Sequence, residues 1–129
     1  MQPQEAPYIV PATDKTPRVE LFPDKGLLSI IGCSIPENAD RLYLPLYDRL
    51  KIYAAEPPAG TLVRVELAYF NSSSSKYLLD LFKLLEDLHA MGRSKVVVEW
   101  HHEHDDLDME EAGRDFKALL EIPVRLVSI

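Results

Sequence analysis

Hydroxyl and amide side chains gather between Phe70 and Lys76, where the sequence reads N-S-S-S-S. Asn and Ser cap helices, because their side-chain oxygens accept hydrogen bonds from the unpaired N–H groups of the first turn. One or two such residues are enough for a cap. Five in a row leave two interpretations open: a helix cap with a polar turn, or a hydroxyl presented for modification.

A second polar cluster runs from 99 to 108 and contains three histidines and several carboxylates. Imidazole and carboxylate groups suit divalent transition metals, and His102 and His104 share one side of an extended segment. The spacing of these residues matches no known zinc motif. We therefore expect a solvated acidic loop here, with no metal and no other cofactor. A metal-dependent enzyme that uses this cluster is the corresponding functional alternative.

Hydrophobic periodicity predicts the elements that position both clusters. A strand is expected over 61–70, and an amphipathic helix follows the serines, with Leu78 and Leu85 on its apolar stripe. Gly92 stands where a left-handed residue commonly ends a helix. A nearly continuous apolar strand over 95–100 precedes the second cluster. Both polar clusters are thus predicted between a buried strand and a helix.

The other segments complete one α/β domain. Residues 18–32 indicate a hairpin, and the tyrosines between Pro36 and Pro57 recur at helical spacing. A last helix is expected over about 108–120 and a last strand over 124–129. The order β-β-α-β-α-β-α-β predicts a mixed, mostly parallel sheet with an N-terminal hairpin and three main helices.

The N-terminal residues 1–17 contain four prolines and few apolar anchors, so they indicate an extended arm, with Tyr8–Val10 against the body of the domain. Residues 18–129 then form the single domain. The arm lacks the basic and apolar regions of a signal peptide, and no apolar run approaches the roughly 20 residues that span a bilayer. We expect no membrane insertion.

Composition bounds the function further. The formal net charge of −7 argues against nucleic acid or an anionic membrane as the main partner. Cys33 is the only cysteine, so an intrachain disulfide is impossible and a reducing compartment fits. A cytoplasmic location is expected.

Three motifs together resemble the SiaC family: GCSIPENAD over 32–40, YFNSSSSKYLLDLFKLLEDLHAMG over 69–92, and EWHHEHDDLDMEEAGRDF over 99–116. Members are small bacterial phosphoproteins of biofilm regulation. Their fold is similar to that of the STAS-domain anti-sigma-factor antagonists. The resemblance covers nearly all of 16–127 and implies a small STAS-like domain without enzymatic activity.

The resemblance implies partner switching in cyclic di-GMP signalling. An unphosphorylated member binds and activates a diguanylate cyclase, a Ser/Thr protein kinase of the anti-sigma-factor type blocks this by phosphorylation, and a PP2C-type phosphatase reverses it. Carried over to this sequence, the acceptor is Ser72, directly after Asn71, with Ser73 and Ser74 as alternatives. Lys76, one turn into the helix, could reach the phosphate. The alternative within this fold is an anti-sigma-factor antagonist acting on transcription.

The motif over 32–40 also supplies candidate partner contacts. Its local role is capping and chain reversal, and the resemblance implies interface contact as a second role. Tyrosines of the following helix belong to the core or line a partner groove. The candidate interface residues are Ser34, Pro36, Glu37, Asn38, Tyr43 and Tyr47.

Overall fold

The structure is a computed structural model that describes residues 6–129. Residues 1–5, the start of the predicted arm, lie outside the described residues. The strands are β1 (Tyr8–Val10), β2 (Arg18–Phe22), β3 (Leu27–Ser34), β4 (Gly60–Phe70), β5 (Lys95–His102) and β6 (Val124–Ser128). The helices are α1 (Ala39–Ala55), α2 (Ser72–Ala90) and α3 (Leu107–Leu119).

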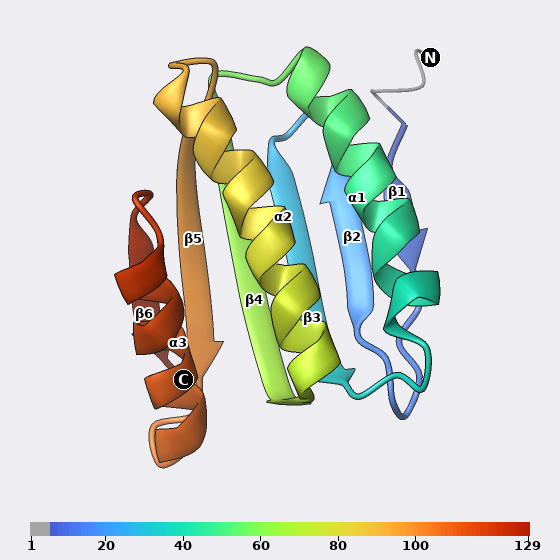
Figure 1. The fold of residues 1–129 in the computed structure, drawn as a ribbon, viewed down its shortest axis with the longest axis vertical. Helices are drawn as coiled ribbons and strands as arrows, with labels where there is room; N and C mark the ends of the chain where they lie inside the picture. The colour runs from blue at the N-terminus through green and yellow to red at the C-terminus, as the bar shows by residue number, and fades with distance from the viewer. Residues whose placement is uncertain (1–5) are drawn as a thin grey trace.

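One sheet holds all six strands in sequence order, from β1 to β6. The β1–β2 and β2–β3 pairs are antiparallel, and the β3–β4, β4–β5 and β5–β6 pairs are parallel. The three helices lie on one face of this sheet, α1 and α2 side by side and α3 over β6 (Figure 1). The predicted class, a mostly parallel α/β sheet with an N-terminal hairpin and three helices, is confirmed.

The core lies between the sheet and the helical layer. Alternate residues of β4, such as Val63 and Val65, point toward the helices and are fully buried. The predicted stripe of α2 meets them, since Leu78, Phe82 and Leu85 are also fully buried. At about 1.5 to 3 kcal/mol per large apolar side chain, this burial is the main force that fixes α2 on the sheet.

Two strands differ from the predicted elements. Tyr8–Val10 form the short strand β1, which pairs with β2 and adds one strand at the start of the predicted order. β5 continues two residues beyond the predicted end, because His101 and His102 pair with Val127 and Ser128 of β6. The predicted solvated loop therefore begins only after His102.

α3 packs close to the sheet because its central residue is a glycine. A Cβ atom on Gly113 would lie 2.5 Å from Cδ1 of Trp100 and 2.4 Å from Cδ2 of Leu126. Both distances are far below van der Waals contact. The absence of a side chain at Gly113 thus lets α3 rest directly on the indole of Trp100.

None of the helices formed by residues 6–129 combines the length and the apolar character that a membrane crossing requires.

Candidate functional site

The junction between β4 and α2 is a tight turn built on Asn71. Its side-chain oxygen accepts a hydrogen bond from the Ser74 backbone N–H at 3.0 Å, and its carbonyl accepts one from Ser75 at 3.0 Å. Its own N–H donates to the Ser34 carbonyl at 3.0 Å. Asn71 is thus the predicted helix cap, and it also ties the start of α2 to the end of β3.

Ser74 faces inward and is fully buried. Its hydroxyl donates to the Ser34 carbonyl at 3.0 Å and lies 2.8 Å from the Ser34 hydroxyl, which lies 2.6 Å from the Tyr43 hydroxyl. Each hydroxyl carries one hydrogen. The hydrogen bonds therefore run from Tyr43 to the Ser34 hydroxyl, on to Ser74, and back to the Ser34 carbonyl.

This buried chain of three hydroxyls also fixes the state of Tyr43. Burial raises the pKa of the Tyr43 phenol, and the hydrogen bonds with Ser34 and Ser74 oppose that effect. The phenol stays protonated and acts as the donor at the start of the chain. The ring of Tyr43 stacks on Tyr77 with centroids 5.4 Å apart, so α1 and α2 are joined beside the junction.

Two hydroxyls of the serine run are exposed. Ser73 donates to the Asn71 side-chain oxygen at 3.0 Å. Ser72, the first residue of α2, makes no side-chain hydrogen bond within the part of the chain that the structure describes. Lys76 is exposed one turn further on and has no ion pair with another described residue. Ser72 therefore presents its hydroxyl directly to solvent, four residues before an exposed lysine.

The N-terminus of α2 differs in charge from those of the other helices. α1 carries Asp40 in its first turn, and α3 carries Asp108 and Glu110 there. α2 carries no acidic residue in its first turn. The positive end of its macrodipole is therefore uncompensated, which favours an anion at this position.

The candidate interface residues divide into buried and exposed ones. Ser34 and Tyr43 are fully buried, and Pro36 is buried as well, so these three cannot touch a partner in this conformation. Tyr43 belongs to the core, the first of its two predicted roles. Glu37 is exposed and pairs with Lys15 at 3.5 Å.

Asn38 is exposed and Tyr47 is partly accessible. Asn38 caps α1 through the Arg41 N–H at 3.4 Å, which agrees with the predicted capping role. Tyr47 is half-buried beneath Lys51, whose Nζ lies 5.5 Å from the ring centroid.

The histidines of the second cluster do not converge. Nδ1 of His102 lies 2.9 Å from the Glu103 carbonyl, and His104 is exposed. His101 and His102 belong to β5 and are largely buried, so the expectation of a solvated loop is wrong for both. Within residues 6–129, no group of three or more His, Cys, Asp or Glu side chains could hold a metal ion.

Sequence reasoning did not identify the anchoring role of Ser74, nor the contact of Tyr77 with α1. Ser74 lies four residues before Leu78 and therefore on the apolar stripe of α2, which is the signal that separates it from Ser72 and Ser73. The Tyr77 hydroxyl donates to the Asp40 carboxylate. Nothing in the local pattern of α2 indicated this partner, because Asp40 is on α1.

The comparisons with known proteins all indicate the same family. A family model described as SiaC family regulatory phosphoprotein matches residues 10–129. An uncharacterized protein of Pseudomonas aeruginosa strain UCBPP-PA14 is 31% identical over 108 residues, which cover 84% of this chain and 85% of that protein.

Two solved structures extend this similarity. Apo-SiaC from Pseudomonas aeruginosa superposes with a TM-score of 0.87 at 28% identity, covering 95% of this chain and 99% of that one. SiaC in complex with the diguanylate cyclase SiaD, which it activates, superposes with a TM-score of 0.89 at 28% identity and the same coverage.

Proposed function

This chain belongs to the SiaC family of regulatory phosphoproteins, and on that premise we propose that it is a non-enzymatic, cytoplasmic partner-switching protein of cyclic di-GMP signalling. Its unmodified form binds and activates a diguanylate cyclase. The similarity to a SiaC that is crystallised with the cyclase it activates supports this role. A Ser/Thr protein kinase of the anti-sigma-factor type and a PP2C-type phosphatase set the level of the modified form.

The proposed acceptor is Ser72. The observation that carries this choice is an exposed hydroxyl, without a partner among the described residues, at the start of the helix that has no acid in its first turn. Ser73 is the exposed alternative, but its hydroxyl is engaged by Asn71. Ser74 is fully buried and holds the Ser34 carbonyl, so a kinase reaches it only if α2 moves off the sheet.

Phosphorylation acts here by local electrostatics. A phosphoserine adds about −1.5 to −2 charges at neutral pH, and a helix N-terminus favours them by about 0.3 to 1 kcal/mol. The domain therefore tolerates the modification. A partner that packs on the bare junction must desolvate the dianion without a counter-charge, which typically costs several kcal/mol. Binding is lost while the fold is kept.

The alternatives have less support. An anti-sigma-factor antagonist shares the fold, but the match over residues 10–129 is to the SiaC family. A metal-dependent enzyme requires a set of converging ligands, and the histidines of the second cluster point to separate partners.

The decisive experiment is phosphosite mapping with the kinase from the same bacterium. We expect one phosphate, on the peptide that contains residues 71–76, and its loss in Ser72→Ala. The phosphorylated protein should no longer activate the cyclase, and the phosphatase should restore activation. Ser73→Ala is the matched control and should be phosphorylated like the wild type. A phosphate at another position, or full activation by the phosphorylated protein, contradicts the proposal.

A further inference from the structure

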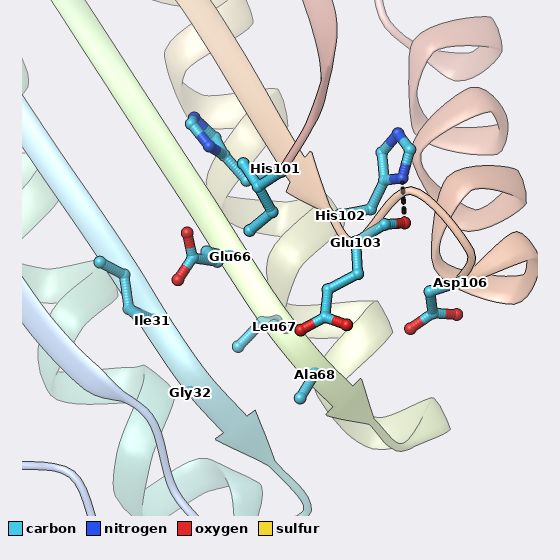
Figure 2. Close-up of a pocket in the computed structure, with 10 residues that line it drawn as sticks. Ile31, Gly32, Glu66, Leu67, Ala68, His101, His102, Glu103 and Asp106 are labelled. Atoms are coloured by element: carbon cyan, nitrogen blue, oxygen red, sulfur yellow. Dashed lines mark hydrogen bonds between the residues drawn. The ribbon is translucent and has the colours of Figure 1, made fainter.

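The face of the sheet opposite the helices carries a pocket of about 290 Å³ beside the ends of β4 and β5 (Figure 2). No helix formed by residues 6–129 covers this face. Ile31 and Ala68 contribute apolar surface, and the carboxylates of Glu66, Glu103 and Asp106 contribute polar surface. No lysine or arginine of the described residues lines the pocket. It is therefore an acidic cavity with an apolar wall.

Each of the three carboxylates has unused hydrogen-bonding capacity. Glu66 accepts from Arg64 at 3.2 Å through Oε1 only, and Asp106 accepts from the Met109 N–H at 3.1 Å through Oδ1 only. Glu103 is exposed and has no ion pair with another described residue. An ionised carboxylate only accepts hydrogen bonds. The pocket can therefore accept hydrogen bonds from a ligand that carries hydrogen-bond donors.

His101 adds an acceptor of a different kind. Its Nε2 lies 3.2 Å from the Glu99 carboxylate and must donate, because the carboxylate cannot. In the tautomer that carries its hydrogen on Nε2, Nδ1 is an acceptor, and it is buried without a partner among residues 6–129. His101 is 9% exposed and lines the pocket, on the same face as Glu66 (Figure 2). Buried polar atoms are rarely left without a partner.

We propose that this pocket binds a guanidinium group. Guanidinium presents five N–H donors in a rigid planar fork and keeps its charge at any physiological pH, which suits several separate acceptors. A metal ion fits poorly, since no three ligand side chains among the described residues converge on one point. The guanidinium belongs either to a small metabolite or to an arginine side chain of another protein. This site is independent of Ser72 and of the proposed switch.

The test is an NMR titration of the assigned, full-length protein with agmatine, and with N-carbamoylputrescine, in which an uncharged urea replaces the guanidinium and the ammonium group is kept. Agmatine should shift the backbone signals of the pocket residues saturably, and N-carbamoylputrescine should not. Glu103→Gln and Glu66→Gln should each weaken agmatine binding by about tenfold or more, as the loss of a charge-assisted hydrogen bond predicts. Glu111→Gln, an exposed acid of α3 outside the pocket, should bind like the wild type.

A second titration, with the tripeptide acetyl-Ala-Arg-Ala-amide, distinguishes the two sources of the guanidinium group. Tighter binding of agmatine assigns the pocket to a free metabolite, and tighter binding of the tripeptide assigns it to an arginine of a partner protein. Three results overturn the proposal: no shift at pocket residues at millimolar agmatine, equal shifts with N-carbamoylputrescine, or equal affinity of the two pocket variants and wild type. Each is readable whether or not Ser72 is a phosphoacceptor.

Discussion

The β4–α2 and β5–α3 junctions have the same architecture and opposite electrostatics. Each follows a parallel strand, and in each an Asx side chain caps the helix: Asn71 accepts from Ser74, and Asp106 accepts from Met109. The second junction supplies its own anions, Asp108 and Glu110, in the first turn of the helix. The first supplies only neutral hydroxyls. The two helices begin at the same edge of the sheet. They differ mainly in whether carboxylates already lie at the N-terminus of the helix.

The difference bears on where a phosphate can act as a switch. At α3 an added anion meets carboxylates, and like charges repel. At α2 it meets unpaired first-turn N–H groups and a nearby lysine, so the fold accepts it. The neutral junction is therefore the more favourable place for a large added charge. Five predictions, ordered by the size of the expected change, concern the two junctions and the packing of their helices.

The largest effect is expected on partner binding. Ser72→Asp should weaken the complex with the diguanylate cyclase by about 10- to 1,000-fold, because a buried unpaired charge costs several kcal/mol. Asp108→Asn, which removes an exposed charge from the other junction, should leave the affinity within about twofold. Isothermal titration calorimetry of both variants against the cyclase measures this. Wild-type affinity in Ser72→Asp refutes the proposed role of this junction, whereas Ser72→Ala should bind normally.

The second-largest effect is expected on stability, from the packing of α3. Gly113→Ala should lower the free energy of unfolding by about 1 to 3 kcal/mol, since the new methyl group meets the Trp100 indole. Trp100 is the only tryptophan, so urea unfolding followed by its fluorescence reports directly on this contact. Glu111→Ala, on the exposed side of the same helix, should change the stability by less than about 0.5 kcal/mol. Equal stability of Gly113→Ala and wild type contradicts the close packing.

α2 is anchored differently, by a buried hydroxyl. Ser74→Ala should cost about 1 to 2 kcal/mol of stability, because the Ser34 hydroxyl loses its acceptor inside the core. Ser73→Ala should be nearly neutral, since its hydroxyl is exposed. Chemical denaturation of the pair gives the difference. If both cost the same, the buried hydroxyl chain contributes nothing to stability.

Exchanging the caps tests the electrostatic contrast itself. Asn71→Asp keeps the acceptor and adds a charge at α2, so we expect a gain of about 0.3 to 1 kcal/mol. Asp106→Asn keeps the acceptor and removes a charge at α3, so we expect a loss of similar size. Both effects should shrink as salt is added. Thermal unfolding at low and high ionic strength provides the measurement, and a loss of stability in Asn71→Asp rejects the uncompensated N-terminus.

The smallest effect concerns Glu86, which links α2 to the residues after α3. The Glu121 backbone N–H holds the pKa of the Glu86 carboxyl below its ordinary value of 4.5, with help from Lys83. Because the folded-state pKa is depressed, this stabilisation is complete above the unfolded pKa and is lost as the pH falls through the folded one.

Unfolding free energies measured from neutral to acidic pH should therefore fall more steeply for wild type than for Glu86→Gln below about pH 4.5. The difference should stay below about 1 kcal/mol, as for other surface charge contacts. Parallel curves would mean that the contact between Glu86 and Glu121 makes no pH-dependent contribution to stability.

Local chemistry in the sequence was sufficient to predict much of this molecule. The cap at Asn71 and the left-handed Gly92, whose φ is 70°, depend on neighbours within one turn. The order of strands and helices follows from periodicity, which each segment carries by itself. The family motifs located the serine run, and its position at the start of α2 is confirmed.

Long-range pairing could not be predicted in the same way. His102 extends β5 because it lies opposite Ser128, and nothing near His102 in sequence reveals that partner. β1 likewise exists only through its register with β2. The sequence left Ser74 as an alternative to Ser72, because the exposure of each serine depends on the rotation of α2 against the sheet. The pocket on the open face joins Glu66 of β4 to Glu103 after β5, so it appears only once the strands are side by side.

The hydrogen bonds of Ser34 have a consequence for the rate at which a partner binds. Its carbonyl holds both Asn71 and Ser74, and its hydroxyl holds Tyr43, so the end of β3 clamps α1 and α2 before any partner arrives. A pre-organised surface needs no ordering step during the encounter, and affinity differences then appear mainly in the dissociation rate. Stopped-flow traces of complex formation should accordingly be single-exponential, with an observed rate that rises linearly with cyclase concentration.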